Sequence, residues 1–281
     1  MINKFIKKLP IADKLIFFSG KFFNKIGVAI LEHKNFKFWQ HHYNKLAFRN
    51  IDVSFDGKEL HYKKDTLEAY ARKDSSDSLV FDLVIMQDEY KPITDFFLAN
   101  NIPFNSFIDL GANIGLTSLY IKKIFPDATV IAVEPDKNNY SMLVRNFDLN
   151  KLSNATALQA GVGKKDCYLL IEEGIRDKKD WAISFQEVDY ETDIRSYSIV
   201  SLLNKYELAE IDFIKMDIEG AEKAVFEKDA DLSFLSKVKV MAIEIHDEFN
   251  IRNDIYAILK QHNFILFNTN ETTIAIKKDL V

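Results

Sequence analysis

A turn that could hold a ligand stands out in the stretch FIDLGANIGLTS, residues 107–118. Its apolar beginning is typical of the end of a buried strand, and an apolar helical pattern follows it. Gly111 lets the chain turn tightly and pass close to a ligand, while Gly115 keeps the helix start near the strand. Asp109 supplies an oxygen acceptor for a cationic amine. The stretch therefore predicts a cradle for a ligand that carries an amino group.

A second acid narrows the choice of ligand. Glu134 ends the strand-like run VIAVE nineteen residues after Gly115, where a carboxylate can accept hydrogen bonds from both hydroxyls of a ribose. A dinucleotide fingerprint would need glycine at positions that hold Asn113 and Leu116, and no Gly-Lys-Ser/Thr sequence of a phosphate loop follows. An amine acceptor and a ribose acid without a phosphate cradle predict S-adenosylmethionine as the cofactor.

Four titratable side chains are placed to act on the molecule that would receive a methyl group. Lys215 and Asp217 alternate with apolar residues in one strand-like run, and Glu244 and His246 do so in the next long one. Because side chains alternate between the faces of a strand, each pair shares a face at the carboxyl end of its strand. Methyl transfer to a hydroxyl requires alignment and removal of the hydroxyl proton. We expect His246 to be the base because an unperturbed imidazole titrates near neutral pH, with Asp217 as the second candidate.

A divalent ion is an alternative to a side-chain base, since a metal acidifies a bound hydroxyl. Asp217, Glu244 and His246 are the predicted ligands, and Glu219 offers a further carboxylate. The acids that follow the strand also have a structural interpretation, in which Glu219 or Glu222 caps the next helix or pairs with lysines.

From Phe104 onward, strand-like and helix-like segments alternate, and they must position the side chains named above. Strands are predicted at 104–110, 129–134, 156–162, 167–173, 181–188, 211–217, 238–246, 263–269 and 272–278. Helices are predicted at about 115–125, 137–150, 197–206 and 251–262, and from about residue 221. This order is typical of an α/β fold with a doubly wound, mostly parallel sheet and an antiparallel C-terminal strand. Ligands of such sheets lie outside the carboxyl ends of the strands, where the predicted turn stands.

The first 85 residues form a predicted N-terminal extension, and the alternating domain covers 86–281. Residues 1–50 carry ten Lys or Arg residues against two acids, a net charge of +8, and are rich in phenylalanine. That pattern is typical of an amphipathic surface helix, which could contact a membrane surface or pack on the main domain. Residues 50–62 alternate as a small hairpin with an Asp-Gly turn, and the polar stretch 63–78 predicts a loop with a short helix.

Composition excludes several classes of protein. No run of eighteen apolar residues could cross a bilayer, and the single cysteine, Cys167, cannot form an internal disulfide. The basic N-terminus begins as a signal peptide would, but Asp13 and Lys14 interrupt its apolar stretch. We therefore expect a cytoplasmic protein, in which residues 1–50 are the part that could touch the inner membrane surface.

Four segments together resemble the FkbM-type family of S-adenosylmethionine-dependent methyltransferases: FIDLGANIGLTS, VEPDKNN, IDFIKMDIEGAEKAVFE and IEIH. The resemblance runs from about Gln87 to the C-terminus, and its most specific part is the K-x-D-x-E-G-x-E element that begins at Lys215. It implies a Rossmann-like fold and O-methylation of sugars or of secondary-metabolite hydroxyls. The candidate catalytic residues are Lys215, Asp217, Glu219, Glu244 and His246. The candidate cofactor-binding residues are Glu89, Tyr90, Asp109, Gly111, Ala112, Asn113, Gly115, Glu134, Pro135, Ala160, Gly161 and Asp217.

Two parts of the cofactor set depend on the resemblance alone. The acid that many methyltransferases use near the adenine is missing after the third strand, where the chain has Ala160 and Gly161, so backbone and apolar groups would contact the adenine. Glu89 and Tyr90 lie in a segment that resembles the one before the family's first strand, and they could close over the cofactor. A helix N-terminal turn with solvated charge is the alternative for these two residues.

Three functions remain open from the sequence. The first is an O-methyltransferase that acts on a hydroxylated small molecule or a glycan. The second is a nucleic-acid methyltransferase, which the basic residues 1–50 favour; residues 51–281 disfavour it because they carry 27 basic and 40 acidic residues, a net charge of −13, and lack an Asn/Asp-Pro-Pro-Tyr/Phe motif. The third is a cofactor-binding protein without catalysis, or a membrane-associated scaffold in a biosynthetic complex. We expect no nucleic-acid partner.

Overall fold

The computed structural model describes residues 14, 51–172, 184–188, 190–246, 249–269 and 271–281. Contacts divide the chain into two compact units, Met1–Asp82 and Leu83–Val281, whereas the sequence-based boundary lies at 85/86. The predictions for residues 1–50, Lys14 apart, fall outside the described residues and stay predictions. Among the helices that the structure describes, none has the length and apolar character needed to cross a membrane.

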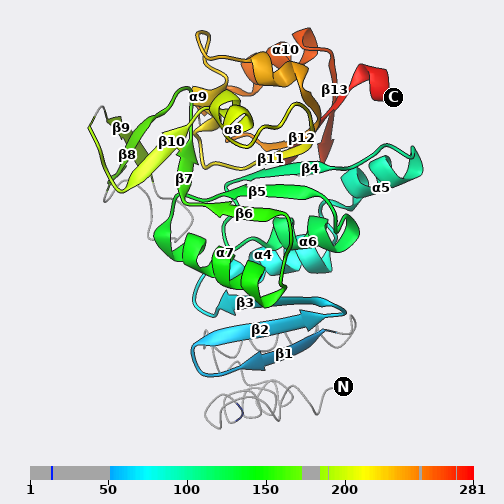
Figure 1. Cartoon of the computed structure of the whole chain (residues 1–281), viewed down its shortest axis with the longest axis vertical. Coiled ribbons are helices and arrows are strands. Elements are labelled where there is room, and N and C mark those ends of the chain that lie inside the picture. Colours follow the sequence, from blue (N-terminus) through cyan, green and yellow to red (C-terminus); the bar gives the residue numbers. More distant parts are fainter. Residues whose placement is uncertain (1–13, 15–50, 173–183, 189, 247–248, 270) are drawn as a thin grey trace, which may run out of the picture. The chain divides into compact units, whose positions relative to one another are not determined.

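The first unit contains a three-stranded antiparallel sheet, followed by a short helix (Figure 1). Its elements are β1 (Asp52–Phe55), β2 (Glu59–Lys64), β3 (Leu67–Arg72) and α4 (Asp77–Phe81). The predicted hairpin is present, with the Asp56 side chain accepting two backbone N–H groups in the turn. The prediction of a loop over 63–78 is wrong at β3, because Leu67, Ala69 and Ala71 are buried and alternate with polar residues, as in a half-buried strand.

The second unit is built on a seven-stranded sheet with the order β13–β14–β12–β11–β4–β5–β6 (Figure 1). The strands are β4 (Ser106–Leu110), β5 (Thr129–Val133), β6 (Ala155–Leu158), β11 (Ile211–Met216), β12 (Val238–Glu244), β13 (Phe264–Thr269) and β14 (Thr272–Lys277). All neighbouring pairs are parallel except those of β14, which is antiparallel to β12 and β13. The predicted doubly wound, mostly parallel sheet with an antiparallel C-terminal strand is confirmed. Strand order reverses at β4, so ligands of this fold lie at its carboxyl end.

Helices cover both faces of this sheet (Figure 1). They are α5 (Lys91–Ala99), α6 (Leu116–Ile124), α7 (Lys137–Leu149), α8 (Ile199–Lys205), α9 (Glu222–Val225) and α10 (Arg252–Gln261), with the shorter turns η1 (Asp82–Met86), η2 (Ser233–Ser236) and η4 (Lys278–Leu280). Helix α7 begins after Asp136, whose side chain accepts the backbone N–H groups of Asn138 and Asn139. This N-cap satisfies backbone donors that would otherwise lack partners. The helix predicted from about residue 221 is only the single turn α9.

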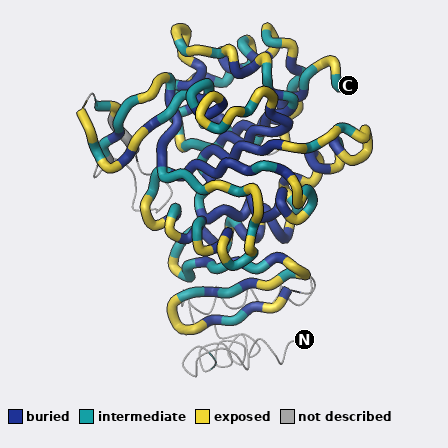
Figure 2. The backbone as a smooth tube through the Cα atoms, viewed as in Figure 1, coloured by how far each residue is buried: buried dark blue, intermediate teal, exposed yellow. Residues whose placement is uncertain are grey.

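The central strands are buried on both faces, as parallel strands covered by helices must be (Figure 2). Ile108 belongs to the apolar core that includes residues of α8 and α10. On the opposite face, the rings of Phe107 and Phe213 stack with their centroids 4.9 Å apart. Because β4 and β11 are parallel and in register, Asp109 and Lys215 face the same side as these two rings.

A second sheet branches from the large one at the end of β6. Its order is β7–β10–β8–β9, with β7 (Ala160–Val162), β8 (Cys167–Glu172), β9 (Ser184–Val188) and β10 (Ile194–Tyr197). The prediction of one strand over 156–162 is wrong, because β6 ends at Leu158 and β7 pairs with β10 instead of the large sheet. Beyond Leu158 the backbone contact with β5 is reduced to the Ala160 N–H and the Glu134 carbonyl, since β5 ends at Val133 and its chain turns toward α7.

Candidate active site

The turn after β4 brings the ends of two strands into backbone contact. Gly111 has φ +75°, and a Cβ atom there would lie 1.7 Å from the carbonyl oxygen of Asp217, which follows β11. Gly115 has φ +85°, and its Cβ atom would lie 2.5 Å from the Leu143 side chain of α7. Side chains are therefore excluded at both positions, and the backbone of the turn can come close to a ligand.

Asp109 is a fully buried carboxyl at the end of β4. Its Oδ2 atom accepts a hydrogen bond from the Ser118 hydroxyl of α6 at 2.7 Å. Its Oδ1 atom has no hydrogen-bond partner among the described residues and lies 3.9 Å from the Lys215 ammonium nitrogen. Burial raises the pKa of this carboxyl above its ordinary value. Buried acceptors without a donor are rare and costly, so Oδ1 is a place where a ligand can donate.

Asn113 carries a second buried acceptor of this kind in the same turn. Its side-chain oxygen has no hydrogen-bond partner among the described residues, and its backbone has φ +50°. The neighbouring Ala112 is buried, and its backbone N–H donates to the carbonyl of Val133 at 3.0 Å. The turn is thus tied to the end of β5 through its backbone.

Glu134 lies directly after β5 and is almost fully buried. Its Oε2 atom accepts the backbone N–H of Asn113 at 2.8 Å, and Oε1 accepts that of Asp136 at 3.0 Å. The Asn139 side chain donates to Oε1 at 3.3 Å, a contact that the sequence analysis did not anticipate. Burial raises the pKa of Glu134 to about 7, although these hydrogen bonds favour the charged form. Pro135, the next residue, is half-buried.

The residues expected near the adenine are packed among protein atoms. Ala160 has no exposed surface, and its backbone N–H donates to the carbonyl of Glu134 at 3.3 Å. A Cβ atom at Gly161 would lie 2.3 Å from the Leu169 side chain of the second sheet. Ala160 therefore borders Glu134, whereas Gly161 faces its own sheet.

The two residues expected to close over the cofactor have different surroundings. Glu89 is exposed, and its charge interacts with those of Lys215 and Asp217. Tyr90 is buried, its hydroxyl hydrogen-bonds Thr117 of α6, and its ring lies 6.2 Å from that of Phe213 between centroids. Tyr90 is thus part of the core beneath the turn, and Glu89 lies at the rim.

Lys215 connects the cofactor turn to the end of β11. Its ammonium group donates to the carbonyl of Gly111 at 2.7 Å and lies 3.3 Å from Asp217 Oδ2. Burial opposes its charge, but Asp217 and Asp109 outweigh this effect and raise the pKa of Lys215. Lys215 therefore balances the two carboxylates and stays charged at neutral pH.

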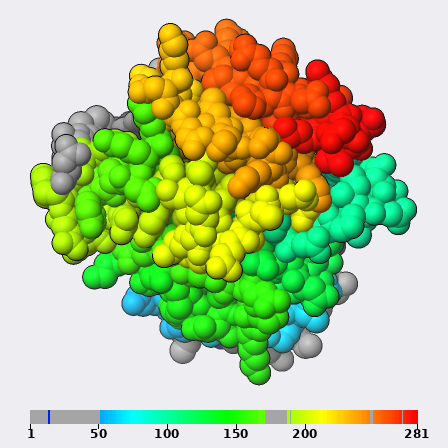
Figure 3. Space-filling model, turned by 45° about the horizontal axis from the view of Figure 1, so that its top comes forward, coloured from blue at the N-terminus to red at the C-terminus, as the bar shows by residue number. Residues whose placement is uncertain are grey.

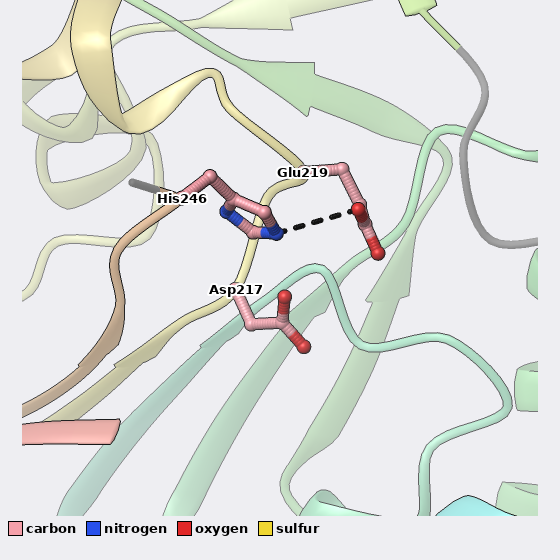
Figure 4. Close-up of side chains that lie close together, drawn as sticks. All are labelled: Asp217, Glu219 and His246. Atoms are coloured by element: carbon pink, nitrogen blue, oxygen red, sulfur yellow. Dashed lines mark ion pairs between the residues drawn. The ribbon is translucent and has the colours of Figure 1, made fainter. Parts of the chain in front are cut away.

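His246 contacts two carboxylates, and Figure 4 shows its ion pair with one of them, Glu219. Its Nε2 atom lies 3.4 Å from Glu219 Oε2, and its Nδ1 atom lies 3.3 Å from Oε2 of the fully buried Glu222. Hydrogen bonds to Glu219 and Glu222 raise the pKa of His246 to about 11. The choice of His246 as base assumed a pKa near neutral. With a pKa of about 11 the ring is protonated at pH 7, and an imidazolium has no lone pair that could accept a proton.

The structure gives Glu222 and Glu244 surroundings that their residue types did not specify. The buried Glu222 orients His246 and also accepts the backbone N–H of Ile218 at 2.9 Å, so it fixes the turn between β11 and α9. Glu244 ends β12, one position beyond Ile243, which pairs with Met216. Burial and then the charge of Asp217 raise the pKa of Glu244 to about 7.

The predicted metal ligands are brought together only in part. Ligand atoms of Asp217, Glu219 and His246 lie within 4.8 Å of one another, so Glu219 takes the place that the sequence analysis gave to Glu244 (Figure 4). Two carboxylates and an imidazole suit several divalent ions. In this arrangement, however, His246 holds a proton on the nitrogen that would face the ion. An ion would have to displace that proton.

Three features are typical of a Rossmann-like methyltransferase fold. The antiparallel β14 lies between β12 and β13, a glycine turn follows β4, and a buried acid follows β5. The family model described as "Methyltransferase FkbM domain" matches residues 109–266, more than half of the chain. The chain belongs to this family, as the resemblance predicts.

The names of individual relatives and of similar solved structures differ in the substrate that they state. Methyltransferase sdnD of Sordaria araneosa is 32% identical over 196 residues, which cover 58% of this chain and 75% of that protein. The ribosomal RNA large subunit methyltransferase G of Shewanella halifaxensis is 32% identical over 84 residues, 28% of this chain and 20% of that protein. A putative caffeoyl-CoA O-methyltransferase structure from Staphylococcus aureus has 12% identity and a TM-score of 0.43, over 73% of this chain and 93% of that one.

Proposed function

We propose that the protein is an S-adenosylmethionine-dependent O-methyltransferase whose acceptor is a hydroxyl group of a small molecule or a glycan. The observation that carries the proposal is the buried Oδ1 atom of Asp109, which accepts no hydrogen bond from the described residues and lies beside the sterically closed glycine turn. A cationic amine is the donor that such an atom favours, and a methionine moiety supplies one. Family membership supports the methyl-transfer chemistry.

The residues at the β4–β5 end fit this cofactor. Asp109 would accept the amine, Glu134 the ribose hydroxyls, and the backbone at Gly111 would pass beneath the ligand. When bound, S-adenosylmethionine supplies a methyl group on a positively charged sulfur. Asp109 and Glu134 supply oxygen acceptors at this end, and the turn lacks the sequence of a phosphate-binding loop, so the residues suit a positively charged ligand.

At the β11–β12 end, Glu244 is the better candidate for the base. Its carboxyl is part-buried, and a pKa of about 7 allows it to accept a proton from a hydroxyl and to release it again. His246 instead donates to Glu219 and Glu222 and holds the turn that carries Asp217. We therefore assign proton removal to Glu244, and to Asp217 and Lys215 the orientation of the acceptor.

The nucleic-acid alternative has less support. The ribosomal RNA methyltransferase named above matches over only 20% of its own length. The net charge of −13 over residues 51–281 also opposes binding to a polyanion.

The cofactor is tested by calorimetric titration of the purified full-length chain with S-adenosylmethionine and its demethylated product, and then with NAD. We expect binding of the first two, and tighter binding of NAD would contradict the proposal. The acceptor class is tested by mass spectrometry of glycans, metabolites and RNA from cells with and without the protein. A difference of one methyl group on a hydroxylated glycan or metabolite is expected, whereas a difference confined to RNA would favour the alternative.

A further inference from the structure

Two exposed cations, one in the second sheet and one in the helix that follows it, form no ion pair with an acid among the described residues. Arg195 lies on β10, and Lys205 lies in the last turn of α8. Within the described part of the chain, no ion pair or hydrogen bond joins either cation to a carboxylate. Unpaired cations are unexpected in a region where residues 51–281 have an excess of thirteen negative charges.

Aromatic rings hold both cations in place. The Arg195 guanidinium carbon lies 5.0 Å from the centroid of the Tyr197 ring and 6.0 Å from that of Tyr168. The Lys205 nitrogen lies 5.7 Å from the Tyr197 centroid and 5.8 Å from that of Tyr206. Cation–π contacts of this length are attractive. Both cations therefore contact the Tyr197 ring.

The rings themselves are anchored. Tyr197 and Tyr206 are partly buried and pack against the apolar core of the second unit. On β10, Ile194 and Ser196 are buried, so Arg195 and Tyr197 point to the opposite side. An arginine stacked on fixed rings keeps its in-plane N–H groups available for a carboxylate or a phosphate.

The row of side chains across this part of the sheet contains no acid. Arg195 is paired with Ala160 of β7 and with Tyr168 of β8, and Tyr168 is paired with Val188 of β9. Directly paired residues lie on the same face of a sheet, so Arg195 has apolar and aromatic neighbours in its row. Asp193 and Glu207 each stand two residues from one of the cations in the chain, but no ion pair joins them to Arg195 or Lys205 within the described residues. Asp166, between β7 and β8, accepts the backbone N–H of Ser198 at 3.0 Å.

This position is next to the proposed cofactor site. Ala160, the strand partner of Arg195, donates its backbone N–H to the carbonyl of Glu134. Neighbouring strands are about 4.8 Å apart, so one strand step separates Arg195 from the residue that borders the ribose acid. Figure 3 shows the yellow-green second sheet on the surface beside the yellow residues of α8.

We propose that Arg195 and Lys205, held by Tyr168, Tyr197 and Tyr206, bind an oxyanion of the methyl acceptor, which is therefore a hydroxylated molecule that also carries a carboxylate or a phosphate. The inference deepens the proposed O-methyltransferase function and depends on it. A uronic acid and a sugar phosphate share this chemistry, and the experiment separates them.

The test is ligand-observed NMR titration of the full-length protein with inorganic phosphate, glucuronate, glucose 6-phosphate and glucose. We expect saturable binding of inorganic phosphate and of at least one anionic sugar, and weaker binding of glucose. The double variant Arg195→Gln/Lys205→Gln should lose about tenfold or more in affinity for the anionic probes, because charge-assisted hydrogen bonds are removed. Glucuronate preference would identify a carboxylate, and glucose 6-phosphate preference would identify a phosphate.

Lys164→Gln is the matched control, since Lys164 is a nearby cation that is already paired with Asp229 and Glu227. It should bind all probes as the wild type does. Equal affinity of the wild type and the double variant, or no saturable binding of any anionic probe to the wild type, would overturn the inference. Displacement of the probes by an RNA oligonucleotide at lower concentration would also overturn it in favour of a nucleic-acid surface.

S-adenosylmethionine is titrated into the same samples. Its affinity should be the same in the wild type and in both variants. Cofactor binding without oxyanion binding would remove only the oxyanion site, whereas oxyanion binding without cofactor binding would remove the proposed function.

Discussion

The two halves of the candidate site, which lie at the ends of neighbouring parallel strands, are built in different ways. At the β4–β5 end, the contacts are made mostly by backbone groups: Glu134 accepts two backbone N–H groups, and Gly111 lies against a backbone carbonyl. At the β11–β12 end, the side chains of Lys215, Glu222 and His246 form ion pairs and hydrogen bonds with their neighbours. Backbone geometry is fixed by the fold, whereas side-chain charges depend on one another and on pH. The first half is thus suited to holding a constant cofactor, and the second to moving a proton.

The largest expected effect is that of Gly111→Ala, which attacks the backbone contact between the halves. The new methyl group would lie 1.7 Å from the Asp217 carbonyl oxygen, so strand ends must separate. We expect a loss of stability on the order of 4 kcal/mol and no detectable cofactor binding, measured by thermal melting and calorimetry. Gly57→Ala is the control, because Gly57 also has positive φ but nothing within 4 Å of its Cβ position. That variant should cost only about 1–3 kcal/mol. Equal costs would show that the contact between the halves is unimportant.

Glu244→Gln should have the second largest effect, confined to turnover. Loss of a general base costs about 10²–10⁴ in kcat, and cofactor affinity should stay unchanged. With a pKa of about 7 for Glu244, wild-type activity should rise with pH through about 7, because the base must be ionised. This acidic limb should vanish in Glu244→Gln and persist in His246→Gln, since His246 is protonated throughout that range. A limb that disappears only in the His246 variant would return the role of base to the imidazole.

Glu134→Gln should weaken cofactor binding about ten- to hundredfold, or ~1.5–3 kcal/mol, by removing charge-assisted hydrogen bonds. Burial raises the folded-state pKa of Glu134 from 4.5 to about 7, so the folded protein keeps this proton longer than the unfolded chain does. The free energy of unfolding should therefore fall as pH rises from about 4.5 to about 7, and Glu134→Gln should lack this contribution. Cofactor affinity should rise over the same interval as the carboxyl ionises. Calorimetry at several pH values measures both trends, and a wild-type affinity independent of pH would contradict this account of the first half.

The smallest expected effect is that of a chelator. At pH 7 the proton on His246 occupies the position that an ion would need, so EDTA should leave the rate of methyl transfer unchanged. Loss of activity that Mg²⁺ or Mn²⁺ restores would instead assign Asp217, Glu219 and His246 as metal ligands. Asp217→Gln should then respond to neither treatment.

The sequence predicted the backbone-built half better than the side-chain half. Glycines at positions with positive φ and an acid after a strand are local signals, so the turn at Gly111 and the place of Glu134 could be inferred from spacing. The pKa of His246 could not, because it depends on Glu219 and Glu222, whose distances to the ring are set by the turn after β11. Alternation placed Glu244 and Asp217 at the carboxyl ends of their strands, but the near-neutral pKa of Glu244 follows from burial, which a sequence does not show.

Errors in the predicted elements have a similar origin. Strand β3 was hidden in a polar stretch because alanines, weak indicators of strands, supply its buried face. The break between β6 and β7 was missed because both strands are continuous in hydrophobicity, and only the end of β5 decides that the sheet stops. Long-range strand pairing determines both outcomes, and it produces no pattern in the local sequence.

The parallel pairing of β7 with β10 has a consequence for how relatives of this protein can diverge. Ala160–Val162 and Arg195–Tyr197 lie side by side, so the chain leaves the large sheet and returns to it through adjacent strands. Insertions and deletions are tolerated where the two ends of a segment are close together, because the rest of the fold is not displaced. Residues 163–193 can therefore change in length over evolution while the seven-stranded sheet stays the same, and a relative that keeps the proposed oxyanion site needs an aromatic ring at the position of Tyr168.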